Sequence, residues 1–391
     1  MNRNLNRINA IDGIRGFSLF GILLANLLIF QYGLWGKDEI HLFQLSTIDH
    51  WFYAFTKIAV EGSFMPIFTF LFGYSMILMR NSLEQKNAKI KWHFFRRSLL
   101  LITFGLLHGT FLWDGDILLL YGIMGLFLLF FLNRKAKTIL IWAVSLFVIF
   151  GVLHFIPLED DDIIERAQIK TYVERTTDIY SSGTYSEIKE HRNNGEDPFD
   201  KLEESKLAFI LLLSPIVIAP MFLFGMYAAK RELFFHPKRE KKLYLILGMV
   251  CGVLGLSMKI YGFTFHHEGI ELTGGPILSF GYIFMLAMMY SSLAKSRLLR
   301  AFENVGKLSL TNYILQSVIC TTIFYGYGYG LFGKIGVFLG TVLGIVIFCI
   351  QITFSSLYTE RFRYGPLEKV MRFGTYLSFR KASNHDERKV A

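Results

Sequence analysis

The sequence predicts an all-α integral membrane protein, a bundle of about ten transmembrane helices with both termini in the cytoplasm. Hydrophobic residues make up 53% of the 391 positions, and charged residues make up only 18%. Apolar runs of roughly 20 residues, the length that crosses the hydrocarbon core of a bilayer, recur along the chain. A soluble chain of this length would need much more polar surface, so a soluble class is excluded.

Each apolar segment predicts a helix, because a single segment within lipid can satisfy all its backbone hydrogen bonds only as a helix. The first segment is longer than the core of a signal peptide and lacks a cleavage pattern, so we expect it to remain as a span. The ten segments are 14–33, 53–79, 98–113, 117–133, 138–157, 207–229, 243–263, 276–294, 308–326 and 335–358.

The connections between these segments alternate in charge. Lysine and arginine gather before the first segment and after the second, fourth, sixth, eighth and tenth. The positive-inside rule places these connections in the cytoplasm, as expected for a multi-pass protein of the cell (plasma) membrane. The net charge of +10 therefore reflects the membrane topology of the chain. We expect a lipid bilayer as partner and no nucleic acid.

One outer loop differs from the others. Residues 158–206 form a long acidic insertion in a single transmembrane domain that covers 1–375, and a polar cytoplasmic tail follows over 376–391. Much of the insertion has a helical pattern. A loop of this length is functional or disordered as a rule, so a lid over the outer mouth and a solvated spacer both stay open.

The hinge inside residues 98–133 carries the strongest indication of a functional site. Two apolar runs meet there, and His108, Trp113, Asp114 and Asp116 stand at their junction. Helix capping in the interface would explain the two aspartates. It does not explain His108, which lies more than one turn inside an apolar run, where an ionisable group is costly. The other explanation for His108 is a buried ring bonded to a neighbouring carbonyl.

The cytoplasmic entrance of the first span holds a second polar group. Asp12 and Arg15 are three residues apart, so they share a helix face and can pair. With Arg7, the Arg15 guanidinium offers bidentate contacts to a phosphate. The alternative is that Arg15 snorkels and only sets orientation.

Other polar residues within the spans have two interpretations each. His50, beside Trp51, is a second base candidate or an interfacial anchor. Glu61 forms an i,i+4 pair with Lys57 or faces a polar cavity. Asn312 and Gln316 share one helix face and either line a substrate cavity or join helices.

No metal site is predicted. The three cysteines lie inside apolar segments at unrelated spacings. His266 and His267 are adjacent, and neighbours on one helix do not readily share an ion.

Several motifs together resemble the YeiB-like bacterial membrane proteins, the domain of unknown function 418. They are the opening R-x-x-x-x-D-x-x-R-G-F (7–17), FTFLFGYSM (68–76), RRSLLLITFGLLHGTFLWDGDILLLYGIMG (96–125), GKLSLTNYILQSVI (306–319) and RFRYGPLEKVMR (361–372). They occur in order along the whole chain. The family is in turn distantly similar to transmembrane acyltransferases, such as heparan-glucosaminide N-acetyltransferase and the acyltransferase type 3 enzymes.

That second resemblance implies a function. The protein would take an acyl group from cytoplasmic acyl-CoA, acetyl-CoA above all, and pass it to a hydroxyl or amine of a sugar, envelope component or small molecule. His108 would be the base and Asp116, in the GDIL element, would orient it. The donor site would comprise Arg7, Asp12, Arg15, Arg96 and Arg97. A permease and a non-enzymatic scaffold are the alternatives, and a homo-oligomer is compatible with each.

Overall fold

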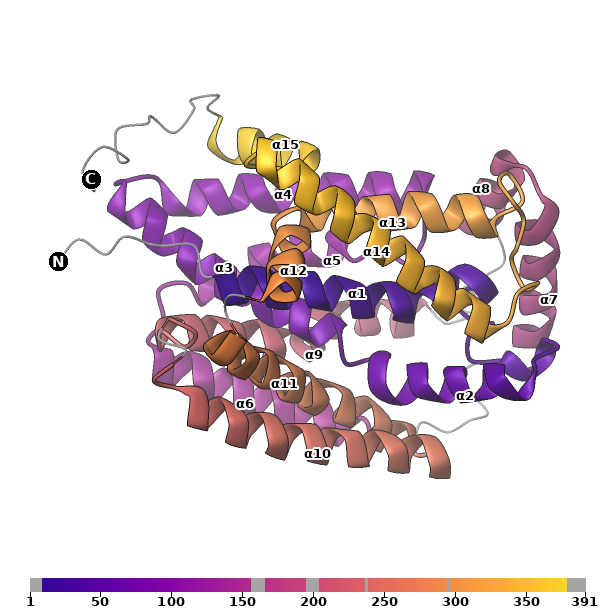
Figure 1. Cartoon of the computed structure of the whole chain (residues 1–391), viewed down its shortest axis with the longest axis horizontal. Helices are drawn as coiled ribbons and strands as arrows, with labels where there is room; N and C mark the ends of the chain where they lie inside the picture. Colours follow the sequence, from indigo (N-terminus) through magenta and orange to yellow (C-terminus); the bar gives the residue numbers. More distant parts are fainter. Residues whose placement is uncertain (1–8, 156–165, 195–203, 236–237, 294–295, 378–391) are drawn as a thin grey trace.

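The chain folds into a bundle of helices. The computed structural model describes residues 9–155, 166–194, 204–235, 238–293 and 296–377, and the described residues form helices and turns with no β-strand. Figure 1 shows that most of the long helices run along the longest axis of the molecule. The predicted all-α class is confirmed.

The predicted apolar segments fall on one or two helices each. The long helices are α1 (Asn9–Tyr32), α3 (Met65–Gln85), α4 (Ile90–Phe111), α6 (Ala136–Leu153), α9 (Glu204–Lys230), α10 (Lys241–Phe265), α11 (Glu268–Leu293) and α14 (Val337–Arg361). Shorter elements complete the bundle: α2 (Thr47–Phe55), η2 (Thr56–Val60), α5 (Leu118–Phe127), η3 (Leu128–Phe130) and α13 (Ser309–Phe324). A short turn of helix, η1 (Ile40–Leu42), follows α1.

Six helical segments of the described chain are long and apolar enough to cross a membrane. They are Asn9–Tyr32, Thr47–Gln85, Ala136–Leu153, Lys241–Phe265, Glu268–Leu293 and Val337–Arg361. The protein therefore has the helices of a membrane protein. The number of ten spans and the side of each terminus stay predictions.

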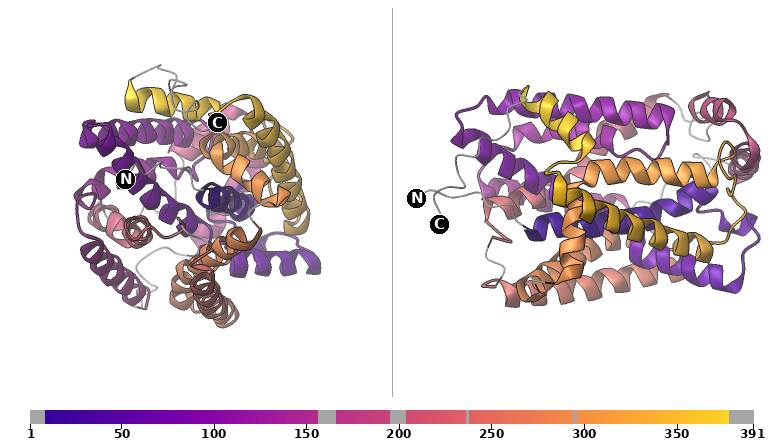
Figure 2. Two further views of the ribbon diagram at one scale, coloured as in Figure 1. Left: turned by 60° about the vertical axis from the view of Figure 1, so that its left-hand side comes forward. Right: turned by 45° about the horizontal axis from the view of Figure 1, so that its top comes forward.

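Helix α1 lies in the middle of the bundle, as the left view of Figure 2 shows end-on. It contacts α3, α11, α13, α14 and α12 (Arg297–Lys307), a short helix that crosses it steeply. Glycines make this crossing possible. A Cβ on Gly16 would lie 2.0 Å from the carbonyl oxygen of Phe302, and one on Gly306 would lie 1.8 Å from that of Asp12. Only residues without a side chain allow the two backbones to approach so closely.

The predicted span 53–79 is not one continuous helix. A π-helical turn, η2, ends at Val60, the chain turns at Gly62 with φ +72°, and α3 begins with Pro66 in its first turn. A positive φ suits glycine, and a proline near the start of a helix loses no hydrogen bond. These two residues explain the break, which divides the apolar segment into α2 with η2 and α3.

A surface helix caps the start of α13. Helix α15 (Pro366–Tyr376) packs against α4 and α13. From α15, Glu368 accepts hydrogen bonds from the backbone N–H groups of Leu310 (2.8 Å) and Thr311 (3.0 Å) and from the Thr311 hydroxyl (2.6 Å). The carboxylate thus satisfies free N–H groups at the start of α13.

The acidic insertion forms two helices over its described part, α7 (Arg166–Ser182) and α8 (Tyr185–Asn194). They lie at the end of the bundle opposite the α3–α4 turn and α15 (Figure 1). Arg192 donates to the carbonyl oxygens of Leu112 and Thr110, both at 2.8 Å, and the Tyr185 hydroxyl donates to that of Phe111 at 2.7 Å. These bonds satisfy carbonyls at the C-terminal end of α4. Over residues 166–194 the insertion is therefore a helical hairpin docked on the C-terminal end of α4, and the choice between a lid and a spacer stays open.

Candidate functional site

A histidine and an aspartate meet at the α4–α5 hinge. The ring of His108, near the end of α4, places Nδ1 2.9 Å from Oδ1 of Asp116, and both side chains are buried. The second carboxylate oxygen, Oδ2, accepts from the Leu119 backbone N–H at 2.8 Å. Asp116 therefore both caps α5 and orients the imidazole. With Nδ1–H donating to the carboxylate, Nε2 is left as the acceptor and potential base.

Three buried polar atoms of helices α4 and α5 and the hinge between them have no hydrogen-bond partner among the described residues. They are Nε2 of His108, Nε1 of Trp113 and the hydroxyl of Tyr121. All three residues are at most 4% exposed. Buried polar groups are nearly always bonded, so such a group needs an explanation. The indole of Trp113 and the hydroxyl of Tyr121 can each donate a hydrogen bond, and His108 Nε2 can accept one.

Aromatic rings enclose the imidazole. Its centroid lies 5.3 Å from the ring of Tyr313 on α13 and 6.2 Å from that of Trp113, which stacks on Phe30 of α1 at 4.2 Å. The Tyr313 hydroxyl also donates to the carbonyl of Gly115 at 3.3 Å, which ties the hinge to α13. The enclosure keeps water away from the pair and strengthens its electrostatics.

Asp114 lines a different part of the structure from the His108–Asp116 pair. It lines a cavity of about 20 Å³, with Tyr32 of α1, Tyr180 of α7 and Tyr325. A cavity of this size holds about one water molecule. The two hinge aspartates therefore have separate places: Asp116 contacts His108, and Asp114 faces the cavity under the docked hairpin.

The structure brings only some of the residues predicted to bind the acyl donor together. Arg15 pairs with Asp12 at 3.2 Å, as the spacing predicts, and its guanidinium donates to the Ser75 hydroxyl of α3 at 2.9 Å. Arg97 of α4 lies close enough to Arg15 for the two charges to repel each other. Within the described chain, Arg97 has no ion-pair partner, and its guanidinium lies 6.0 Å from the Phe72 ring. The fold thus brings two guanidinium groups from α1 and α4 together.

Two other predicted donor residues do not join this pair. Arg96 lies beside Trp92, 5.8 Å from its ring. Consecutive helical residues point about 100° apart, so Arg96 and Arg97 occupy different faces of α4. Arg7 lies outside the described residues.

His50 is exposed in the first turn of α2, after a capping box formed by Ser46 and Asp49. Among the described residues no hydrogen bond or ring contact joins it to His108, and its role as a second base stays a prediction. Glu61, at the end of η2, has its predicted i,i+4 ion pair with Lys57 at 2.8 Å.

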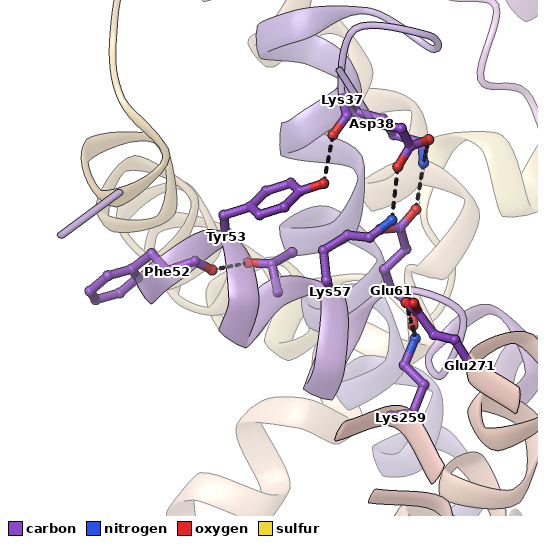
Figure 3. A network of polar contacts seen from close by, with 9 residues as sticks. Lys37, Asp38, Phe52, Tyr53, Lys57, Glu61, Lys259 and Glu271 are labelled. Atoms are coloured by element: carbon purple, nitrogen blue, oxygen red, sulfur yellow. Dashed lines mark hydrogen bonds and ion pairs between the residues drawn. The ribbon is translucent and has the colours of Figure 1, made fainter. Parts of the chain in front are cut away.

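Glu61 also belongs to a larger charge network, which Figure 3 shows from close by. Lys37 lies 2.6 Å from Glu61, and Lys57 lies 2.8 Å from Asp38. The network extends to the α10–α11 hairpin through Lys259, which lies 3.1 Å from Glu271. Three lysines face three carboxylates, so the network is balanced in charge.

Asn312 and Gln316 are buried between α13 and α14. The Asn312 amide donates to the Val305 carbonyl (3.2 Å) and the Ser355 hydroxyl (3.0 Å), and the Gln316 amide donates to Gln351 Oε1 at 2.9 Å. Gln351 donates back to the Asn312 carbonyl at 3.0 Å. These bonds match the interhelical alternative for the polar face of this span rather than a lined cavity.

Sequence reasoning missed three residues of the site. Tyr121 and Tyr313 look like ordinary apolar residues in their helices, and only packing reveals them. Lys259 carries a usable signal, since a lone lysine within an apolar span marks a function or a partner.

The comparisons with known proteins give the family of this chain. The family described as "Protein of unknown function (DUF418)" matches residues 228–378. The chain is 32% identical over 387 residues to the "Uncharacterized protein YxaH" of Bacillus subtilis (strain 168), which covers 95% of each chain. It belongs to the YeiB-like DUF418 family.

A more distant member of the DUF418 family is the "Uncharacterized protein YeiB" of Escherichia coli (strain K12). It is 27% identical over 392 residues, 95% of this chain and 96% of that one. The resemblance to the family is therefore confirmed along nearly the whole chain. The names of these relatives state no activity, so the distant similarity to acyltransferases stays a prediction.

Proposed function

We propose that this DUF418 protein is a membrane-embedded acyltransferase, with acyl-CoA as donor and a hydroxyl or amine as acceptor. The observation that carries the proposal is the buried contact between His108 and Asp116, which leaves His108 Nε2 unpartnered. A carboxylate-oriented histidine with a free nitrogen is suited to general-base catalysis.

The step is a transfer between a thioester and an acceptor. His108 Nε2 takes the proton of the acceptor O–H or N–H, and the oxygen or nitrogen forms a bond to the thioester carbonyl carbon. The carbon–sulfur bond then breaks, and the thiolate of coenzyme A receives the proton from His108. The products are an ester or amide and the free thiol. Trp113 Nε1 and the Tyr121 hydroxyl are donors suited to the developing oxyanion.

Donor binding is assigned to Arg15 and Arg97. Their guanidinium groups lie close enough to repel each other, and such a pair suits an anion such as the phosphates of coenzyme A. Ring contacts and one electrostatic interaction link Arg97 to the His108–Asp116 pair. Phe72 lies beneath Arg97 and 5.2 Å from the Tyr121 ring, and Tyr121 interacts with Tyr313, which packs against His108.

The acceptor would approach from the opposite end, through the cavity at Asp114. The cavity is lined by Tyr32, Tyr180 and Tyr325, and aromatic rings with a carboxylate suit the faces and hydroxyls of a sugar. Because the cavity measures about 20 Å³, the α7–α8 hairpin must shift to admit an acceptor.

The test uses the purified full chain in lipid nanodiscs with acetyl-CoA and a panel of sugar and amine acceptors. Release of free thiol is measured together with thermal stabilisation by acetyl-CoA. We expect His108→Ala to lower thiol release by about 10²- to 10⁴-fold. His154→Ala is the matched control and should keep full activity, because the ring of this histidine, at the end of α6, bonds the Phe150 carbonyl of its own helix (2.7 Å) and no other group among the described residues. Lack of acetyl-CoA binding, or full activity in His108→Ala, would overturn the proposal.

Transport is a second candidate, favoured by the break between α2 and α3. Broken helices with buried charges line substrate paths in transporters. Flux of labelled solutes into proteoliposomes distinguishes the two functions. A transporter moves solute without consuming acetyl-CoA, and its flux depends on Glu61 and Lys259 rather than on His108.

A further inference from the structure

We propose that a groove beside the α3–α4 turn binds an anionic phospholipid of the cytoplasmic leaflet, of the phosphatidylglycerol type. This site is separate from the His108–Asp116 pair and does not depend on the proposed function. The groove has a volume of about 690 Å³. Its walls come from the turn before α4, the first turns of α4 and the end of the α5–η3 segment, including Leu129 and Asn133.

The end of the groove at the start of α4 suits a phosphate. Lys89 and Lys91 both line it. Helix α4 begins at Ile90 without a side-chain cap, so the first N–H groups of a 22-residue helix are available there. Free N–H groups and the helix dipole favour an anion at this position. Cationic side chains and a helix start thus converge on one end of the groove.

Arg96 adds a third cationic group next to the groove. Its guanidinium lies 5.8 Å from the ring of Trp92, which lines the groove, and its Nε is buried without a hydrogen-bond partner among the described residues. A buried, unpartnered guanidinium nitrogen needs an acceptor. A phosphodiester oxygen provides such an acceptor.

The rest of the groove suits acyl chains. Trp92 and Phe95 stack at 5.5 Å, and they are 53% and 37% exposed. One turn after Phe95 along α4, Leu99 is 43% exposed, so exposed apolar surface continues beyond the groove. Tryptophan is typical of the membrane–water interface. A molecule that fills the whole groove therefore needs a phosphate at one end and hydrocarbon at the other.

Charge favours an anionic lipid over a zwitterionic one. The connections on this side of the bundle are rich in Lys and Arg, and the positive-inside rule places them in the cytoplasm, where anionic headgroups attract basic segments. A phosphatidylcholine headgroup would bring its own cation toward Lys89 and Lys91. A soluble phosphate would leave Trp92 and Phe95 uncovered.

The test is native mass spectrometry of the full chain in detergent, titrated in parallel with phosphatidylglycerol and phosphatidylcholine. We expect the wild type to bind phosphatidylglycerol preferentially. The double variant Lys89→Gln/Lys91→Gln should bind it about thirtyfold more weakly, because two cations near an anionic lipid are removed. The control Lys241→Gln/Lys242→Gln removes two exposed lysines at the start of α10 and should change the affinity about twofold or less.

Trp92→Ala keeps both lysines and tests the acyl-chain contacts; we expect it to weaken binding of phosphatidylglycerol as well. Glycerol phosphate, a headgroup without acyl chains, should not compete. Equal binding of the two lipids by the wild type would overturn the proposal. So would equal losses in the two lysine pairs, or competition by glycerol phosphate.

Discussion

The ammonium group of Lys259 on α10 donates a hydrogen bond to the backbone carbonyl of Glu61, 3.1 Å away, at the break between α2 and α3. The same ammonium lies 3.1 Å from Glu271, and Lys259 is only 2% exposed. The Tyr282 hydroxyl donates to the Ala59 carbonyl at 2.8 Å, and the Ser279 hydroxyl donates to the Ser63 carbonyl. The α10–α11 hairpin thus satisfies the carbonyls that the helix break sets free.

Loss of the Lys259 charge should therefore destabilise the fold. Lys259→Met leaves Glu271 and the Glu61 carbonyl without their partner, at a cost of about 3 kcal/mol. Adding Glu271→Gln removes the uncompensated carboxylate and should restore about half of the loss. Thermal unfolding in detergent measures both. A double variant no more stable than Lys259→Met would contradict this account.

Asp116 should matter more for activity than for stability. Asp116→Asn keeps an oxygen that can accept from the Leu119 N–H but no longer holds the His108 ring as a carboxylate does. We expect acyl transfer to fall about 10²-fold or more, with a stability loss of about 1 kcal/mol or less. Asp116→Ala, which also loses the cap, should be less stable than Asp116→Asn. Equal activity in wild type and Asp116→Asn would remove Asp116 from the mechanism.

The crossing of α1 and α12 should not tolerate a methyl group. Gly306→Ala would place a Cβ 1.8 Å from the Asp12 carbonyl oxygen, so the helices must separate. We expect a loss of about 3 kcal/mol. Gly252→Ala on α10 is the control, because a Cβ there meets no atom within 4 Å, and it should be neutral or stabilise by about 0.5 kcal/mol. Similar melting temperatures for the two variants would show that the contact is not tight.

The docked hairpin should depend on Arg192. Arg192→Ala frees the carbonyls of Leu112 and Thr110 and should raise tryptic cleavage after Lys189 about tenfold. Arg192→Lys should give partial protection only, because an ammonium does not reproduce the planar contact with two carbonyls. Cleavage is followed on intact cells, where the protease reaches the side on which the charge pattern predicts the hairpin. Unchanged cleavage in Arg192→Ala would mean that other contacts hold the hairpin.

The start of α8 should loosen in acid. The carboxylate of Glu187 accepts from the backbone N–H and hydroxyl of Thr184 at 2.8 and 2.9 Å, and these bonds lower the pKa of Glu187 from its ordinary value of 4.5. A carboxyl group with a lowered pKa stabilises the folded state above 4.5, and this contribution disappears as the pH falls through the lowered pKa. After correction for the intrinsic exchange rate, which itself falls with pH, the protection of the α8 amides should therefore decrease between pH 5 and about pH 3. Glu187→Gln, which does not titrate, should lose this dependence.

Much of the fold follows from the hydropathy pattern. Long apolar segments locate the helices, and the Asp114–Gly115–Asp116 cluster between two of them locates the hinge. The break at Gly62 and Pro66 does not follow from this pattern. The segments on both sides of it are strongly apolar, so the mean hydropathy over a span-length window does not reveal it. Its signal is local: glycine followed closely by proline, with Glu61 beside them.

The site is less predictable from the sequence. The Asp12–Arg15 and Lys57–Glu61 pairs are local, so helical spacing predicts them. The proximity of Arg97 to Arg15, and of Tyr313 to His108, depends on how distant helices pack. The amides of Asn312 and Gln316 illustrate the same limit, since a polar helix face gives no information on whether it meets solvent or another helix.

The bond between Glu368 and the start of α13 has a practical consequence for anyone who shortens this chain. Helix α15 lies on the surface of the bundle, so it invites truncation. Its Glu368 carboxylate nevertheless accepts hydrogen bonds from the backbone N–H groups at the start of α13. A truncation before residue 366 would leave these N–H groups without their acceptor. An affinity tag fused after residue 391 would keep the hydrogen bonds of Glu368.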